Sequence, residues 1–329
     1  MTAARAPASP RCQLIGRDNG AGLSRDLALL ADALCEAGAS VRVTGLPRRG
    51  RLAVWLTRLR LAGRAPAFDL DLMLERVRPE FRRAAARNVL IPNPEYFRPA
   101  DRAALPGLDA VWVKTHHAAR LFGALGVPVR YVGFSSPDRL LAGVPRRHAF
   151  FHGPGRSGNK GTAALLALWA RHPEWPALTV VWRRKRVEIG ALPANVTLVR
   201  EHLDDAAYCE LQNAHRFHLC PSQTEGYGHY LVEAMSCGAV VVTLDAEPMN
   251  ELVTPARGVL VPARPLGRQD LATLYGYEET AMEAAIERCL AMAPAEAETL
   301  GRAARDWYEA NRAAWPQRLR EAADELLAI

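Results

Sequence analysis

Two carboxylates and two glycines stand close together in residues 221–233, and their spacing suits recognition of a polar ligand. Glu225 directly precedes the pair Gly226 and Gly228, and Glu233 falls about two turns into the helix that follows. Glycine lets an anion approach the backbone, and the N–H groups at a helix N-terminus point outward to meet it. The segment predicts an anion site at the two glycines, with the two carboxylates holding different hydroxyl groups of one elongated ligand.

A second glycine-rich loop, Gly155-Arg-Ser-Gly-Asn-Lys-Gly161, carries two cations, Arg156 and Lys160. Only three of the 42 basic residues in the chain are lysine, at positions 114, 160 and 185. A lysine ammonium is a compact point charge that suits contact with a phosphate. Taken alone, these two cations would equally fit a solvated surface loop.

Both loops together resemble one known family. The Glu-x7-Glu pattern from Glu225 to Glu233, the Gly-Arg…Lys-Gly loop, and the stretches Ala234–Thr243 and Pro248–Val253 occur in the order found in GT-B glycosyltransferases, specifically the retaining family 4-like group. The resemblance covers roughly residues 150–260. It implies an enzyme that moves a sugar from a nucleotide-diphosphate donor to a saccharide, lipid-linked or other acceptor, as in cell-envelope or polysaccharide glycosylation.

The resemblance also implies roles for particular residues. Arg156 and Lys160, with Gly226 and Gly228, would neutralise the donor diphosphate, because fixed cations and N–H donors stabilise the charge that grows on the leaving group. Glu233 would hold the donor ribose. The transferred sugar would meet the four consecutive residues Glu225, Gly226, Tyr227 and Gly228. No cofactor and no metal are expected, since the nucleotide sugar is a substrate and the leaving phosphate helps to take the acceptor's proton. The alternatives are a nucleotide-sugar epimerase of the same fold or a non-catalytic sugar-nucleotide or polyanion-binding module.

Short apolar runs alternate with helical patterns along both halves of the chain, which is typical of parallel α/β sheets. The expected strands are Cys12–Gly16, Val41–Val43, Asn88–Ile91, Ala110–Val113, Val129–Val132, Ala149–Phe151, Leu178–Trp182, Val196–Val199, Phe217–Cys220 and Val240–Leu244. They predict two doubly wound Rossmann-like domains facing across a crevice: an acceptor-side domain over residues 1–140 and a donor domain over 141–305. Residues 306–329 are expected to form a helical tail, broken or kinked at Pro316, that packs back on the first domain.

Polar residues that follow the predicted strands of the first half are candidates for the walls of that crevice. Gly20 and Gly22 lie in a glycine-rich turn, for which a tight turn capped by Ser24 is the alternative. The other candidates lie after later strands, and they are Asn93, Glu95, Lys114, His116 and His117. Either histidine could reach a sugar hydroxyl, and the sequence does not choose between them. Surface or helix-capping histidines are the alternative.

Asp69-Leu70-Asp71 spells the Asp-x-Asp motif of metal-dependent transferases with the other common fold. Three residues match such a motif by chance often, and the surrounding context of that fold is missing. We therefore expect no metal at these two carboxylates.

Charge is distributed unevenly between the halves. Residues 1–150 carry 24 Lys and Arg against 12 Asp and Glu, whereas residues 151–329 carry 18 against 23. The stretch Arg48–Arg64 contains six arginines and no acid, and a helix there would align Leu52, Trp55, Leu56 and Leu59 on one face. This pattern fits a helix lying on an anionic membrane surface, or a core-facing helix with a basic rim. Nucleic acid is an unlikely partner, because aromatic residues do not interleave the arginines.

Composition excludes other classes of protein. No run of 18 apolar residues exists that could span a membrane, and no secretory signal is expected at the start of the chain. The six cysteines are scattered without metal-ligand spacing, so we expect buried thiols in a reducing compartment. The expected location is cytoplasmic, with a peripheral position at the inner face of the membrane as the further expectation.

Overall fold

The computed structural model describes residues 9–18, 20, 22–46, 51–184 and 191–329. The chain divides into two compact units. Unit 1 comprises Met1–Phe134 together with Arg312–Ile329, and unit 2 comprises Ser135–Asn311.

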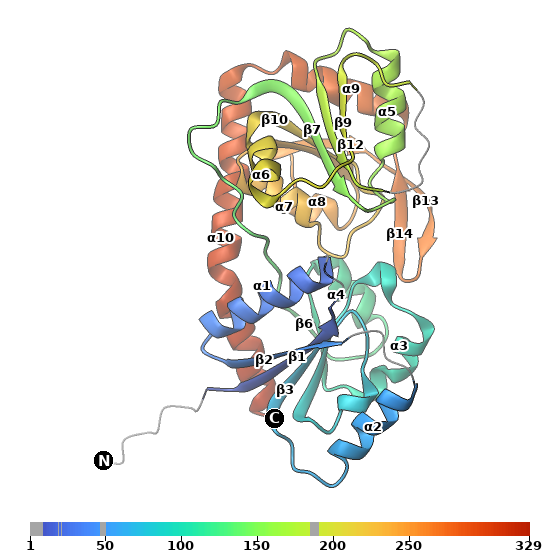
Figure 1. The fold of residues 1–329 in the computed structure, drawn as a ribbon, viewed down its shortest axis with the longest axis vertical. Helices are drawn as coiled ribbons and strands as arrows, with labels where there is room; N and C mark the ends of the chain where they lie inside the picture. Colours follow the sequence, from blue (N-terminus) through green and yellow to red (C-terminus); the bar gives the residue numbers. More distant parts are fainter. Residues whose placement is uncertain (1–8, 19, 21, 47–50, 185–190) are drawn as a thin grey trace, which may run out of the picture. The chain divides into compact units, whose positions relative to one another are not determined.

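Unit 1 is built on a six-stranded parallel sheet in the order β2-β1-β3-β4-β5-β6 (Figure 1). Its strands are β1 (Arg11–Arg17), β2 (Ser40–Leu46), β3 (Phe68–Leu74), β4 (Ala85–Ile91), β5 (Ala110–Val113) and β6 (Val129–Tyr131). Its helices are α1 (Gly22–Glu36), α2 (Arg51–Leu61), α3 (Pro99–Ala104) and α4 (His116–Gly123), with short 3-10 turns η1 (Pro79–Phe81), η2 (Pro94–Tyr96) and η3 (Leu105–Gly107). The central strands are buried on both faces, which explains their nearly continuous apolar sequences.

The predicted strands of unit 1 are present, but the central strand β3 was not among them. Its sequence, Phe-Asp-Leu-Asp-Leu-Met-Leu, places two aspartates in an apolar run. Helix α1 begins at Gly22, so Ser24 lies within the helix and is not its N-cap. The Ser24 hydroxyl accepts a hydrogen bond from the Gly20 N–H at 2.8 Å and donates one to Asp18 at 2.6 Å.

Unit 2 contains a second six-stranded parallel sheet in the order β12-β11-β10-β7-β8-β9, plus an antiparallel hairpin (Figure 1). The sheet strands are β7 (Arg147–Gly155), β8 (Leu178–Trp182), β9 (Val196–Val199), β10 (His215–Cys220), β11 (Val240–Asp245) and β12 (Gly258–Pro262). The hairpin consists of β13 (Arg264–Gln269) and β14 (Ala272–Gly276), and the helices are α5 (Thr162–Arg171), α6 (Asp205–Ala214), α7 (His229–Ser236), α8 (Met249–Leu252) and α9 (Glu279–Ala291). The strand order reverses between β7 and β10, and ligands of such sheets bind outside the carboxyl ends of the strands at this point.

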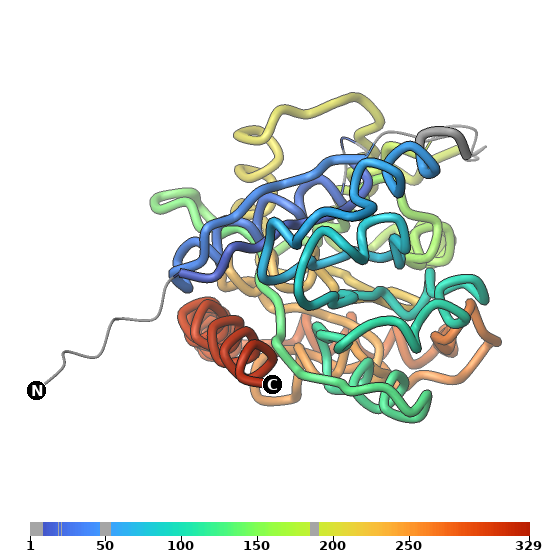
Figure 2. The backbone as a smooth tube through the Cα atoms, turned by 90° about the horizontal axis from the view of Figure 1, so that it is seen from below, coloured from blue at the N-terminus to red at the C-terminus, as the bar shows by residue number. Residues whose placement is uncertain are grey.

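The last helix, α10 (Pro294–Leu327), contributes to both units and continues through Pro316. The helix is therefore not broken at this proline, and the kink that was the other expectation stays a prediction. Figure 2 views α10 nearly end-on. Proline removes one backbone hydrogen bond, but packing on either side holds the helix. In unit 1, the Trp315 ring lies 4.6 Å from that of Phe134, and the Arg318 guanidinium donates to the Val132 carbonyl at 3.0 Å.

Five of the six cysteines are buried free thiols, as expected, whereas Cys35 on α1 is exposed. In the part of the chain that the structure describes, each helix is too short or too polar to cross a bilayer.

Candidate active site

Two loops of unit 2 meet at the point where the strand order of its sheet reverses. Residues 155–161 follow β7 and residues 221–228 follow β10, and these two strands are hydrogen-bonded neighbours. The Gln223 N–H donates to the Asn159 carbonyl at 2.9 Å, which ties one loop to the other. Gly161 has a φ of +69°, and a Cβ there would lie 2.9 Å from the Pro221 carbonyl oxygen. A glycine is therefore required for the loops to approach this closely.

A buried histidine fixes the base of the first loop. The Nδ1 of His152 on β7 donates to the Leu219 carbonyl at 2.7 Å, and its Nε2 accepts from the Thr162 hydroxyl at 2.9 Å. Complete burial lowers the pKa of His152 to about 4, so the imidazole is neutral at pH 7. One side chain thus joins β7, β10 and the start of α5 without adding charge.

Lys160 and Glu225 meet across the two loops. The Lys160 ammonium forms an ion pair with Glu225 Oε1, and it also lies 4.5 Å from the centre of the Tyr230 ring. Ser222 donates its hydroxyl proton to the same carboxylate oxygen. Since Ser222 has only one proton to give, the Tyr230 hydroxyl donates to Ser222 Oγ, at 2.6 Å. Burial raises the pKa of the Tyr230 phenol above its usual value, so it stays a neutral donor.

Arg156 and the start of α7 complete this cluster. Arg156 is exposed and makes no hydrogen bond or ion pair with a residue that the structure describes. Gly228, with a φ of +108°, caps the N-terminus of α7, and both Gly226 and Tyr227 are buried beside it. The N–H groups in the first turn of a helix lack partners within the helix and favour negative charge. Two cations, a carboxylate and a helix N-terminus thus gather on adjacent loops.

Glu233, on α7, belongs to a second buried network of polar side chains. The residue is 3% exposed, and its carboxylate accepts a hydrogen bond from the Gln212 amide at 3.2 Å. The Gln212 oxygen accepts from Arg139 at 2.9 Å, and the Arg139 guanidinium also pairs with Asp205 at 2.9 Å. These contacts fix the orientation of the Glu233 side chain, and two of the contributing residues, Gln212 and Asp205, lie on α6.

Sequence reasoning missed several of these residues. Ser222 and Tyr230 lie inside the motif at 221–233, yet residue type alone assigned them no part. Gln212 and Arg139 lie 21 and 94 positions before Glu233, so no local spacing could associate them with it. Only the fold brings them together.

In unit 1, the predicted residues that follow β5 have internal partners. Lys114 is buried, and its ammonium pairs with Asp26 on α1 at 2.7 Å. His116 is exposed and stacks on the Tyr131 ring at 4.0 Å, whereas His117 is buried.

The remaining predicted residues of unit 1 belong to other elements. Gly20 is in the turn before α1, and Gly22 is the first residue of that helix. Asn93 precedes η2 and Glu95 lies within it, where its side chain is buried. All of the assignments in unit 1 stay predictions.

Asp69 and Asp71 lie on the buried strand β3. Asp69 pairs with Arg11 at 3.1 Å, and Asp71 is completely buried. Among the described residues, no group of three or more His, Cys, Asp or Glu side chains is arranged to hold a metal ion.

Comparison with known proteins adds independent findings. Residues 187–272 match the family model of glycosyl transferases group 1. The chain is similar to sucrose-phosphate synthase from Thermosynechococcus elongatus, with a TM-score of 0.70 and 19% sequence identity over 97% of this chain and 100% of that one. It is also similar to Anabaena HepE in complex with UDP-glucose, with a TM-score of 0.67 and 17% identity over 96% and 100% of the two chains. For alpha,alpha-trehalose-phosphate synthase (UDP-forming) from Burkholderia vietnamiensis, the TM-score is 0.65, with 12% identity over 97% and 100%. No curated protein sequence matches the chain significantly.

The structural matches confirm the expected fold, GT-B, with two Rossmann-like α/β units. The family match begins in residues 187–190, outside the described part, and continues through the loop at 221–228. Residues 187–272 thus form a group 1 glycosyl transferase domain within a chain that has the GT-B fold.

Proposed function

We propose that the loops 155–161 and 221–228 of unit 2 bind the diphosphate and sugar of a nucleotide-sugar donor. The observation that carries this proposal is the Lys160–Glu225 pair, because it places a cation for phosphate and a carboxylate for sugar hydroxyls side by side. The loops also lie at the strand-order reversal of the sheet, where such folds bind nucleotides. HepE in complex with UDP-glucose and a UDP-forming synthase share the fold, which makes UDP the first nucleotide to test.

In this proposal each residue has a distinct part. Arg156, already exposed, and Lys160, released from Glu225, neutralise the diphosphate, while the N–H groups at Gly226–Gly228 bind its oxygens. Glu225 then accepts hydrogen bonds from the donor sugar beside Tyr227. Glu233 holds the ribose, oriented by Gln212.

The proposed reaction needs no side-chain nucleophile and no metal. The bond between the anomeric carbon and the phosphate oxygen breaks, and the acceptor hydroxyl oxygen bonds to that carbon on the same face, so configuration is retained. The acceptor's proton passes to the departing phosphate. Unit 1 supplies acceptor contacts, for which exposed His116 is a better candidate than buried His117.

Calorimetric titration tests the donor assignment. Arg156→Ala combined with Lys160→Ala should weaken UDP binding about 100-fold and leave uridine binding within twofold, because charge-assisted hydrogen bonds to phosphate are lost while contacts to the nucleoside remain. Arg302→Ala on α10, an exposed arginine in an i,i+4 ion pair, is the matched control and should change neither. Equal weakening of UDP and uridine would contradict the assignment, as would unchanged UDP affinity.

We further propose that α2 docks on an anionic membrane from which a lipid-linked acceptor is taken. Three large apolar side chains of α2 are exposed, Trp55 at 55%, Leu56 at 39% and Leu59 at 51%, which supports docking over the core-facing alternative. Arg58 and Arg60 beside them are exposed as well. A helix with exposed tryptophan and leucine among arginines suits a lipid interface. Arg48 and Arg49 of the same stretch lie outside the described residues.

Vesicle co-sedimentation tests this docking. Arg58→Ser with Arg60→Ser should reduce binding to vesicles containing anionic lipid about 30-fold, since each basic residue near such a surface contributes about 1 kcal/mol. The charge-matched control is Arg288→Ser with Arg302→Ser on α9 and α10, which should bind normally. Trp55→Ser should also weaken binding. Equal binding by all three variants would rule out docking through α2.

A further inference from the structure

The β13–β14 hairpin of unit 2 encloses a cavity beside the two loops. Its strands pair in antiparallel fashion, and the Tyr275 N–H on β14 donates to the Gln223 carbonyl at 2.8 Å. The Asn159 amide donates to Gln269 on β13 at 2.9 Å. These two bonds anchor the hairpin to both loops, so the cavity behind it has a defined wall.

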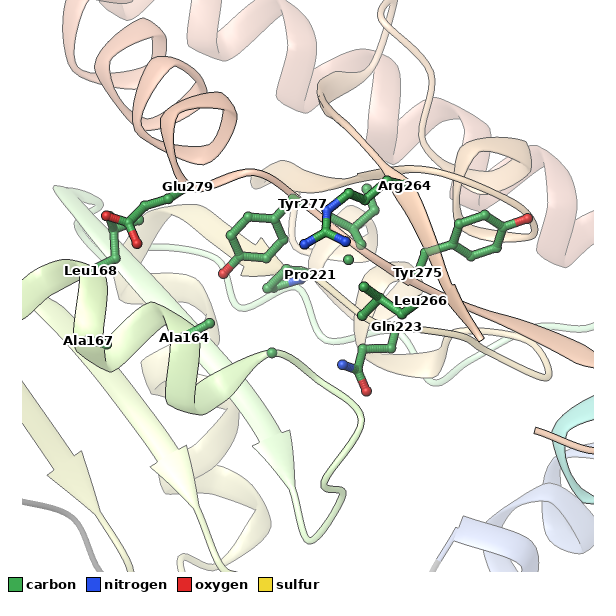
Figure 3. Close-up of a pocket in the computed structure, with 13 residues that line it drawn as sticks. Ala164, Ala167, Leu168, Pro221, Gln223, Arg264, Leu266, Tyr275, Tyr277 and Glu279 are labelled. Atoms are coloured by element: carbon green, nitrogen blue, oxygen red, sulfur yellow. The ribbon is translucent and has the colours of Figure 1, made fainter. Parts of the chain in front are cut away.

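The cavity has a volume of about 240 Å³. Its walls come from α5, the loop after β10, the end of β11, the hairpin and the start of α9 (Figure 3). The lining residues are Gly161, Ala164, Ala167, Leu168, Pro221, Gln223, Leu244, Arg264, Leu266, Tyr275, Gly276, Tyr277 and Glu279. Pockets for larger organic ligands have volumes of roughly 300–1,000 Å³, so this cavity suits a single ring.

Polar groups in the lining lack partners among the described residues. The Tyr277 hydroxyl is buried without a hydrogen bond, an arrangement that costs free energy unless a ligand or water supplies a partner. The Gln223 side-chain amide likewise makes no hydrogen bond with a described residue. In Figure 3, Arg264 extends between the rings of Tyr277 and Tyr275. The cavity thus offers aromatic and aliphatic faces together with a few hydroxyl and amide groups.

The charges in the lining are already balanced. The Arg264 guanidinium lies 2.5 Å from the carboxylate of Glu278, and Glu279 forms an ion pair with Arg171. Nothing in the cavity therefore favours an anion or a cation. A neutral ring with apolar faces and hydroxyl groups at its edge, as in a hexose, matches both the aromatic walls and the unpartnered polar atoms.

We propose that this cavity is an accessory site that binds one neutral sugar ring. The site adjoins the donor loops, since Gly161, Pro221 and Gln223 belong to those loops and also line the cavity. An occupant of the cavity would therefore contact the donor loops. The ring could come from a free monosaccharide or from a residue of a growing saccharide, and both present the same chemistry.

Ligand-observed NMR with glucose, galactose, mannose and N-acetylglucosamine tests the proposal. Ala164→Leu fills the cavity from an exposed helix position, and we expect it to weaken binding of the preferred monosaccharide at least tenfold. Ala163→Leu, also exposed on the same turn but outside the lining, should bind that sugar normally. Tyr277→Phe, which removes only the hydroxyl, should weaken binding about three- to tenfold. A maltose-series oligosaccharide binding tighter than its monomer would identify a growing chain as the source, and equal affinity would identify free sugar.

Two results would overturn the accessory site: no monosaccharide binds the wild-type chain, or Ala164→Leu and Ala163→Leu bind equally. The same variants are titrated with UDP in parallel, and both should bind it with wild-type affinity. If UDP fails to bind even the wild-type chain, the donor proposal fails, while the difference between the two alanine variants still decides the sugar site.

Discussion

The two units of this glycosyltransferase share one architecture but use their charged residues differently. In unit 2, Arg156 is exposed and has no partner among the residues that the structure describes, and Lys160 contacts a carboxylate from a neighbouring loop. In unit 1, Lys114 likewise follows directly after a strand, β5, yet it is buried against Asp26. Both lysines are paired with a carboxylate, so pairing alone does not distinguish them. The distinction that we propose lies in their surroundings: Lys160 lies where two loops meet, beside an exposed arginine, whereas Lys114 lies in a buried contact with α1.

The largest expected effect on stability comes from Lys114. Lys114→Met should lower the free energy of unfolding by about 3–5 kcal/mol, because it leaves the Asp26 carboxylate buried without its ion-pair partner. Arg156→Ala in unit 2 should change the free energy of unfolding by no more than about 0.5 kcal/mol, because the substitution removes only an exposed side chain. Urea unfolding followed by circular dichroism measures both. Similar losses for the two variants would remove the distinction between a structural and a ligand-binding cation.

A pH-dependent effect on stability is expected from Asp71 in the sheet of unit 1. It aligns with Gln13 on β1 and Asn88 on β4, and neither carboxylate oxygen has a hydrogen-bond partner among described residues. Burial raises the pKa of Asp71 to about 8, well above its value in an unfolded chain. The folded state therefore keeps a proton that the unfolded state releases. Its contribution to stability is fully present below about pH 4 and is lost as the pH rises to about 8.

Asp71→Asn should remove this dependence. Between pH 5 and pH 8, the stability of the wild-type chain relative to the variant should fall by up to about 1.4 kcal/mol per pH unit. Urea unfolding at pH 5, 6, 7 and 8 measures the difference. A difference that stays constant with pH would show that the Asp71 carboxyl is not protonated in the folded state.

Sequence patterns predicted the strands whose residues are nearly all apolar. The bounds of β5, β8 and β9 agree with the predicted runs, which are apolar except for Thr179 and Thr197. Strand β3 was not predicted, because Asp69 and Asp71 interrupt its apolar pattern. The β13–β14 hairpin was not predicted, because β13 is mostly exposed and its sequence shows no run of apolar residues.

The candidate site was predictable in its loops but not in its internal contacts. Motif order pointed to Arg156, Lys160 and Glu225, whereas the pairing of the last two spans 65 positions and depends on β7 lying beside β10. A helical wheel could not decide whether Trp55 and Leu59 face the core or solvent, because that depends on where α2 packs. The Lys160–Glu225 pairing and the exposure of α2 both depend on packing between residues far apart in the sequence. The spacing of nearby residues therefore could not predict them.

A crystal structure of the chain with UDP tests the central claim most directly. The account predicts the diphosphate within hydrogen-bond distance of Arg156, Lys160 and the backbone N–H groups at Gly226–Gly228, with the Lys160–Glu225 pair separated and the ribose at Glu233. UDP bound elsewhere on unit 2, or bound with Lys160 still paired to Glu225 and no contact from Arg156, would contradict it.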